Sequence, residues 1–249
     1  MNSDEYIHHL EMQLKNSEKN HLKFYLTYLY SKINNQFSST AQLLEIGSGA
    51  GLSRFFLPQN VKRTDVLPWD QNEVIGHVNA LTLPYNSNQF DGAFCVDVVH
   101  HLNDPLKAIE ELIRVVKPGS KVVVIEPLVT FLSYPVYKIF HSEKTSWNLS
   151  FSDSGNSLSS TPSDGDQGVS KSLFLDNKQN LHAVRRLTPI CKWRVELFSP
   201  LSFFATGGLS QPLPTPVWLV RTILKLESLL PKFILKITAS RILIVLEKY

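Results

Sequence analysis

Three glycines at alternate positions follow a carboxylate in the segment LLEIGSGAG, residues 43–51. Gly47, Gly49 and Gly51 make a turn almost free of side chains, so a ligand can approach its backbone closely. Glu45 stands two residues before the first glycine. Its carboxylate can orient the turn and, directly or through water, meet an ammonium group, whereas it would repel a pyrophosphate. The segment therefore predicts a binding site for a nucleotide-like cofactor with a positively charged amino-acid part.

A nicotinamide dinucleotide is the alternative ligand for this turn. Its fingerprint GxGxxG needs a third glycine for close packing of helix on strand, and that position holds Leu52. Asp65 ends the next predicted strand, where its carboxylate can accept hydrogen bonds from ribose hydroxyls. Glu45 and Leu52 together favour a cofactor other than NAD(P), so an NAD(P)-dependent reductase remains only the alternative.

Strands and helices alternate along the chain and would place these residues at one edge of a sheet. Strands are predicted at 41–47, 61–67, 73–80, 90–99, 121–127, 190–200 and 240–248, and helices at 4–36, 52–57 and 103–121, the last capped by Asp104 and stopped by Pro118 and Gly119. This order predicts an α/β fold with a Rossmann-like, mostly parallel sheet, helices on both faces and antiparallel pairing of the last strands. Ligands of such sheets bind beyond the carboxyl ends of the strands. Polar residues fall there: Glu45, Asp65, Asn79, Asp97 and Glu126.

The domain organisation follows from shifts in composition. Residues 1–40 are expected to form an N-terminal helical segment and residues 41–249 the main domain. Within that domain, 129–190 is expected to be a substrate-side insertion, and 200–240 an amphipathic helical insertion. Residues 150–172 are rich in serine, aspartate and glycine, which predicts either a mobile lid or disorder.

Composition narrows the class of partner. The chain has 249 residues, 43% of them hydrophobic, and a formal net charge of +3, without a run of lysine and arginine interleaved with aromatics, so no nucleic-acid partner is expected. Cys95 and Cys191 lie in apolar segments without metal-ligand spacing, which predicts reduced core residues and no metal site. The charged N-terminus predicts a cytoplasmic protein. The basic, apolar stretch from 216 could lie on a membrane surface or cover the sheet as ordinary amphipathic helices.

Four segments resemble the class I S-adenosylmethionine-dependent methyltransferases, within their type 11-like group. They are LLEIGSGAG, RTDVLP, VNALTLPYNSNQFDGAFCVDVVHHLNDP and LIRVVKPGSKVVVIEP, and they keep the family's order and spacing across 42–128. The resemblance implies a seven-stranded sheet, the last strand antiparallel, and S-adenosylmethionine as cofactor. It implies cofactor-binding roles for Glu45, Gly47, Ser48, Gly49, Gly51, Asp65, Val66, Asn79, Ala80 and Asp97. Asn79 departs from the family's aspartate, although its amide oxygen can still accept a hydrogen bond.

The resemblance also indicates where catalysis would occur. His101 opens the substrate-side segment and is the candidate base, with His141 and its neighbour Glu143 as a second candidate. The histidines could instead pack or bond to backbone. The part after residue 128 is similar to methyltransferases encoded with bacterial surface-polysaccharide enzymes, which implies a small-molecule, saccharide or lipid-linked acceptor. A non-catalytic cofactor-binding module of the same fold is the other alternative, and the acceptor and oligomeric state remain open.

Overall fold

The computed structural model describes residues 21–57, 60–68, 73–141, 143–149, 165–176, 180, 184–186, 188–207, 213 and 215–249. These residues form one seven-stranded sheet in the order β3-β2-β1-β4-β5-β7-β6. The strands are β1 (Leu43–Ile46), β2 (Val61–Thr64), β3 (Val74–Ile75), β4 (Phe90–Val96), β5 (Val116–Pro127), β6 (Cys191–Phe198) and β7 (Arg241–Lys248). β1 to β5 pair in parallel, and β7 runs antiparallel to both β5 and β6. The predicted mostly parallel sheet with an antiparallel last strand is confirmed.

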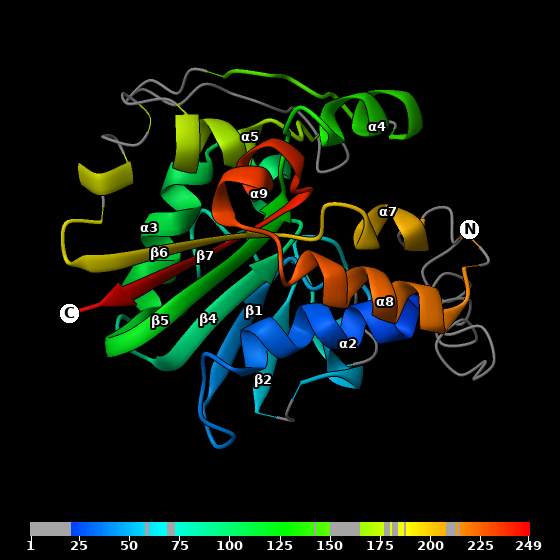
Figure 1. The fold of residues 1–249 in the computed structure, drawn as a ribbon. Helices are drawn as coiled ribbons and strands as arrows, with labels where there is room; N and C mark the ends of the chain where they lie inside the picture. The colour runs from blue at the N-terminus through cyan, green and yellow to red at the C-terminus, as the bar shows by residue number, and fades with distance from the viewer. Residues whose placement is uncertain are drawn as a thin grey trace.

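Helices cover both faces of this sheet, as predicted (Figure 1). The longer ones are α2 (His21–Asn34), α3 (Pro105–Val115), α4 (Ser133–Phe140), α8 (Val217–Glu227) and α9 (Lys232–Thr238), and the shorter elements are η2 (Leu52–Phe55), η3 (Val99–His101), α5 (Val169–Lys171), η4 (Ser172–Asp176) and α7 (Ser202–Thr206). α3 packs with Leu44 and Val124 in one core, and α2 with Leu43 and Val123 in the other. Successive strand residues thus enter opposite cores, which explains why these strands are apolar on both faces.

The predicted N-cap of α3 is present, but the helix ends differently from the prediction. The Asp104 side chain accepts a hydrogen bond from the Lys107 amide at 2.9 Å. Pro118 and Gly119, expected to stop the helix, lie inside β5, which begins directly after Val115. Val116 pairs with Phe90 and Lys121 with Gly92, so Pro118 and Gly119 lie in a register shift between these two pairs.

Two other predicted elements are shorter in the structure. The strand expected over 73–80 is reduced to Val74–Ile75, because Glu73 and His77 adopt positive φ on either side of it. The helix expected over 52–57 is the 3₁₀ turn η2. The expected helix before residue 21 lies outside the described residues.

Part of the segment after β5 packs against the body of the domain. The serine-rich segment 150–172, predicted to be either a mobile lid or disordered, falls largely outside the described residues, but 165–172 are buried and include α5. These residues contact η3, where the Asp166 amide donates to the His100 carbonyl. None of the described helices is long and apolar enough to cross a membrane.

Candidate active site

The glycine turn after β1 has the backbone that the sequence predicts. Gly47, Gly49 and Gly51 all have positive φ, between 52° and 71°. A Cβ on Gly47 would lie 2.4 Å from a Val98 methyl, whereas one on Gly49 would have no described atom within 4 Å. The Ser48 hydroxyl is buried and has no hydrogen-bond partner among the described residues. Open space above a glycine beside an unpaired hydroxyl fits a ligand that lies on this turn.

Glu45 lies beneath the turn. Its Oε2 accepts a hydrogen bond from Ser53 Oγ at 2.5 Å, and Ser53 in turn accepts one from Arg63 Nε at 2.8 Å. Burial raises the pKa of Glu45 to about 7 against the opposing effects of Ser53 and Arg63. The carboxylate therefore ties η2 and β2 to the turn, which is the orienting role considered for it. The contact with a cofactor ammonium stays a prediction.

The residues predicted to contact the ribose and the adenine, Asp65, Val66, Asn79 and Ala80, also follow the carboxyl ends of strands at this edge of the sheet. Asp65 accepts hydrogen bonds from the amides of Gly49 (2.7 Å) and Leu67 (2.9 Å), which leaves lone pairs on both oxygens. Val66 is exposed and Ala80 is buried. Asn79 uses its amide oxygen to accept from the Leu81 amide at 2.9 Å, so it shapes the local turn as well as facing solvent.

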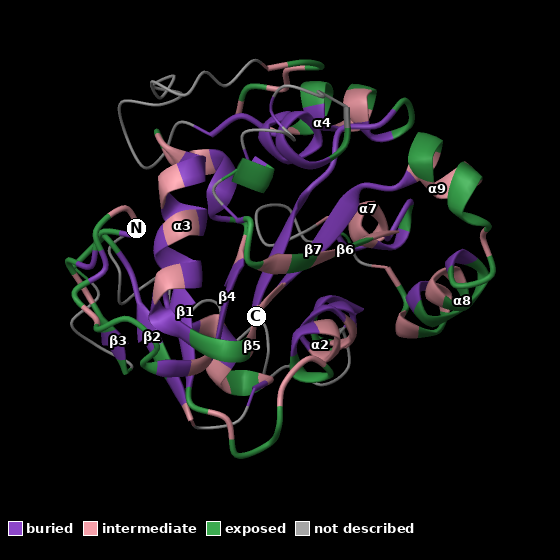
Figure 2. Ribbon diagram, turned by 90° about the vertical axis from the view of Figure 1, so that its left-hand side faces the viewer, coloured by how far each residue is buried: buried purple, intermediate pink, exposed green. Residues whose placement is uncertain are grey.

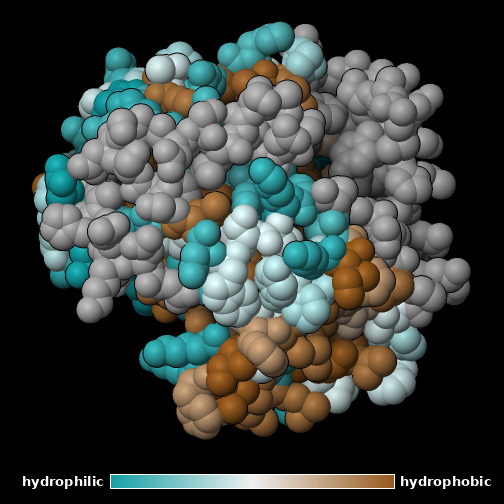
Figure 3. Space-filling view, turned by 90° about the horizontal axis from the view of Figure 1, so that it is seen from above, coloured by the Kyte–Doolittle hydropathy of each residue, from teal (hydrophilic) through white to brown (hydrophobic). Residues whose placement is uncertain are grey.

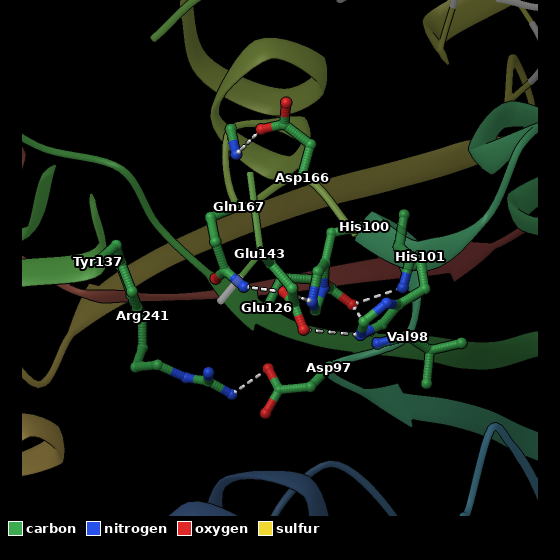
Figure 4. A network of polar contacts seen from close by, with 12 residues as sticks. Asp97, Val98, His100, His101, Glu126, Tyr137, Glu143, Asp166, Gln167 and Arg241 are labelled. Atoms are coloured by element: carbon green, nitrogen blue, oxygen red, sulfur yellow. Dashed lines mark hydrogen bonds and ion pairs between the residues drawn. The ribbon is translucent and has the colours of Figure 1, made fainter. Parts of the chain in front are cut away.

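Asp97 follows β4 and pairs with an arginine that sequence reasoning missed (Figure 4). Its Oδ1 lies 2.6 Å from Nη2 of Arg241, the first residue of β7. The Arg241 side chain is 2% exposed, and burial opposes its charge, but Asp97 raises the pKa of Arg241 above its ordinary value. Asp97 has a φ of 56°, a strained backbone held in place by this buried partner.

A buried histidine and carboxylate connect the ends of β4 and β5. His100 Nδ1 lies 2.5 Å from Glu126 Oε2, and Glu126 Oε1 accepts the amides of Val98 (2.8 Å) and Val99 (2.7 Å). Burial alone would lower the pKa of His100, but the two carboxylates beside it, Glu126 and Glu143, raise that pKa to about 10. His100 is therefore an imidazolium at neutral pH.

Glu143 lies close to three histidines, two of which, His100 and His101, are about 40 residues away in sequence. Its carboxylate lies 3.4 Å from His100 Nε2, 3.7 Å from His101 Nε2 and 3.8 Å from His141 Nδ1. The structure thus brings both predicted catalytic histidines, His101 and His141, to one carboxylate (Figure 4 labels His100, His101 and Glu143). Burial raises the pKa of Glu143, but its bond to His100 and the other histidines outweigh this and lower that pKa to about 2.

The environments of the two adjacent histidines move their pKa values in opposite directions. Burial lowers the pKa of His101, and repulsion from the His100 imidazolium lowers it further. His101 is therefore neutral where His100 is charged. Titratable neighbours separated in this way are typical of acid and base assignments in active sites.

Residues 165–168 of the insertion pack against the cluster formed by Glu143 and its histidines. Gln167 Nε2 donates to Glu143 Oε2, and the Asp166 amide donates to the His100 carbonyl at 3.0 Å. A Cβ on Gly165 would lie 2.8 Å from His101 Nδ1 and 3.0 Å from Glu143 Oε2. Only a glycine therefore allows this close approach, which shields one side of His101.

The same cluster could hold a metal ion. Within the described parts of the chain, His100, His101 and Glu143 each offer one ligand atom, all within 4.8 Å of one another. A proton on His100 Nε2 competes for the lone pair that a metal would use. The sequence predicted no metal ligands because these three residues have no ligand spacing along the chain.

The aromatic residues after β5 divide between core and surface. Tyr137 is 2% exposed and donates to the Ser240 carbonyl at 2.7 Å, so it belongs to the core. Tyr134 and the more exposed Trp147 pack edge to face with ring centroids 5.5 Å apart. Of these three aromatic residues, Tyr134 and Trp147 are the ones available to an acceptor.

Comparison with known proteins identifies a domain that covers about a third of the chain. Residues 44–124 match the family model described as a methyltransferase domain. A crystal structure of a SAM-dependent methyltransferase from Archaeoglobus fulgidus aligns with a TM-score of 0.52 and 13% identity, over 90% of this chain and 93% of that one. Residues 44–124 form a class I methyltransferase domain. The predicted family and fold are confirmed.

The relatives of this methyltransferase domain share little outside it. A demethylmenaquinone methyltransferase from Bacillus mycoides is 35% identical over 78 residues, 31% of this chain and 32% of the relative. A tRNA (carboxymethyluridine(34)-5-O)-methyltransferase from Arabidopsis thaliana is 43% identical over 58 residues, 22% of this chain and 14% of the relative. The chain thus spans a third or less of the length of these relatives. Because their names specify different acceptors, these similarities do not determine the acceptor of this chain.

Three polar residues of this site were not predicted to act in it: His100, Glu126 and Arg241. Glu143 was predicted as the neighbour of His141. The sequence placed Glu126 at a strand end, and a carboxylate closing an otherwise apolar strand is an available signal. Arg241 has no such signal, because an arginine at the start of a strand is usually exposed.

Replacing Glu143 by glutamine should lower the pKa of His100, because His100 loses one of its two carboxylate neighbours. The pKa of His101 should fall as well, since Glu143 favours its protonation. Histidine side-chain NMR titration of the full chain measures both. Glu110→Gln, which removes a carboxylate from an exposed pair with Lys107, is the matched control. An unchanged His100 pKa in Glu143→Gln would contradict the geometry of the cluster.

Proposed function

We propose that this chain is an S-adenosylmethionine-dependent methyltransferase. The observation that carries the proposal is the turn after β1, where Gly49 leaves open space above the backbone and its amide donates to the Asp65 carboxylate, beside the unpaired hydroxyl of Ser48. The methyltransferase domain over 44–124 supports the same assignment. A cofactor with ribose and amino-acid groups needs such hydrogen-bonding groups next to a backbone without side chains.

The residues of the turn fit this cofactor part by part. Ser48 and the backbone at Gly49 would hold its amino-acid end, and Asp65 its ribose hydroxyls through the lone pairs left by the amides of Gly49 and Leu67. Val66 and Ala80 offer apolar contact for the adenine. When bound, S-adenosylmethionine supplies an electrophilic methyl group whose bonding electron pair leaves with sulfur.

His101 is the residue proposed to take the proton of the acceptor. It is neutral beside the charged His100, and its side chain is 24% exposed. As the acceptor oxygen or nitrogen forms its bond to the methyl carbon, its proton would pass to His101. Glu143, 3.7 Å from His101 Nε2, would stabilise the resulting imidazolium. His141 contacts the same carboxylate from the outer side and is the second candidate.

We propose that the acceptor is a small molecule with a nucleophilic oxygen or nitrogen. A saccharide or a lipid-linked intermediate is the first candidate. The demethylmenaquinone methyltransferase similarity supports a small-molecule acceptor. Tyr134 and Trp147 would offer such a molecule an aromatic edge, although the ammonium group of Lys171 covers the Trp147 ring. A non-catalytic module of the same fold is the competing function, because Asn79 uses its amide oxygen within its own turn.

Titration calorimetry decides the cofactor. S-adenosylmethionine and S-adenosylhomocysteine should each bind at one site per chain, and NAD should not bind, because Glu45 lies under the turn and Leu52 replaces the third glycine. Binding of NAD alone would overturn the proposal. Binding of S-adenosylmethionine without formation of S-adenosylhomocysteine across a broad acceptor panel would favour the non-catalytic module.

A further inference from the structure

Apolar side chains are exposed together on α4, α8 and α9. On α8, α9 and the turn between them, Trp218, Leu226, Leu229, Phe233 and Ile237 are 51–74% exposed. α9 has no buried residue, and Figure 2 shows both helices at the edge of the molecule, largely unburied. Brown atoms gather at that side in Figure 3. Isolated exposed apolar residues are ordinary, but a contiguous group of this size marks an interaction surface.

The loop before α4 and the end of α4 extend the same surface. The Leu132 amide donates to the Ile237 carbonyl at 3.1 Å, which joins the start of α4 to α9. Phe131 is 77%, Ile139 71% and Phe140 69% exposed. We define the docking face as the exposed apolar residues of 131–140 and 217–238.

The charges on the docking face have one sign. In the described span 217–238 the exposed ionisable residues are all cations: Arg221, Lys225, Lys232 and Lys236. The acid of this span, Glu227, is buried and accepts the amides of Leu201 (2.5 Å) and Ser202 (2.8 Å). Exposed aromatic and aliphatic side chains interleaved with lysine suit the boundary of an anionic bilayer. They suit a protein partner less, because interface cores are depleted of lysine.

We propose that the docking face binds the surface of an anionic lipid bilayer, and that the acceptor is an amphiphile presented there. The second part rests on the proposed methyltransferase function. The polypeptide connects face and site directly: α4 leads within three residues of its end to Glu143, and α9 is followed by Arg241 of β7. A bilayer at the docking face would therefore bring polar head groups to the edge of the sheet where His101 and Glu143 lie.

Vesicle co-sedimentation of the full-length protein tests the docking face. Phosphatidylcholine vesicles containing about 30% phosphatidylglycerol should bind the protein, and pure phosphatidylcholine vesicles should bind it more weakly. Each of Lys232→Gln and Lys236→Gln should reduce the affinity for anionic vesicles about fivefold. The double variant Leu229→Ser/Phe233→Ser should lose most of this affinity. Tryptophan emission should shift to the blue when the wild type binds vesicles, and this shift should be absent in a Trp218→Phe variant.

Ile75→Ser is the matched control, because Ile75 is 47% exposed on β3, at the opposite edge of the sheet. It should bind vesicles like the wild type. Equal vesicle binding by Leu229→Ser/Phe233→Ser and Ile75→Ser would overturn the proposal. So would a dimer in light scattering that this double variant abolishes, together with no vesicle binding, since a second copy would then occupy the face. Vesicle binding and light scattering do not require the cofactor. A negative result in the cofactor calorimetry can therefore be distinguished from a negative result in vesicle binding.

Discussion

Replacing Glu126 by alanine is expected to lower the free energy of unfolding by about 3–5 kcal/mol. The Glu126 side chain is fully buried, and it accepts hydrogen bonds from the amides of Val98 and Val99 while facing the His100 imidazolium. Truncation leaves two buried amides unpaired and a buried charge with one carboxylate instead of two. Urea unfolding at about pH 6.5 measures the loss.

Glu126→Gln separates the charge from the hydrogen bonds. Its amide oxygen can still accept the two backbone amides, but it no longer favours a proton on His100. The pKa of His100 is about 10 in the native protein, above its ordinary value of 6.5. The folded state thus holds a proton that the unfolded chain has lost between these values, so this stabilisation is complete below pH 6.5 and disappears as the pH rises towards 10.

The difference in unfolding free energy between wild type and Glu126→Gln should therefore shrink from about pH 6.5 to about pH 9. The pH slope contributed by one such proton is at most about 1.4 kcal/mol per pH unit. Comparing the two proteins at each pH cancels the groups that titrate in both. A difference independent of pH would show that Glu126 supports the amides alone and that His100 is neutral.

The features that the sequence predicts are local ones. The glycine turn, the cap at Asp104 and the alternation that gives the sheet each depend on residues a few positions apart, and the structure has all three. The end of α3 was predicted too late, because the local signal at Pro118 and Gly119 does not show that β5 already begins at Val116, which pairs with Phe90. Gly119 keeps a turn-like backbone, with a φ of 79°, inside the register shift.

The features that could not be predicted from the sequence depend on how segments distant in the chain pack together. His101 and His141 were chosen separately, and their shared contact with Glu143 arises from the fold of the insertion over η3. The Asp97 to Arg241 pair joins two strand ends that are 144 residues apart. The amphipathic pattern of 217–238 predicted an apolar face, but no periodicity says whether that face will be covered, and the structure leaves it open.

Gly49→Ala is the substitution expected to have the largest effect on cofactor binding. Gly49 has a φ of 52°, so an alanine costs about 1–2 kcal/mol of backbone strain, and its methyl group would enter the open space proposed for the cofactor. Crowding worth about 1–3 kcal/mol corresponds to an affinity about fivefold to 150-fold weaker for S-adenosylmethionine. Calorimetry and urea unfolding on the same protein measure the two effects.

Gly119→Ala supplies the control for strain without crowding of the site. Gly119 also has a positive φ, 79°, and open space for a Cβ, but it lies near the start of β5, away from the strand ends that hold the site. Its alanine variant should lose a similar stability and keep full affinity. Gly47→Ala should lose more stability than either, because its methyl group would also meet Val98 at 2.4 Å. Equal cofactor affinity in Gly49→Ala and Gly119→Ala would mean that the cofactor does not lie on this turn, since only the first substitution narrows the space above it.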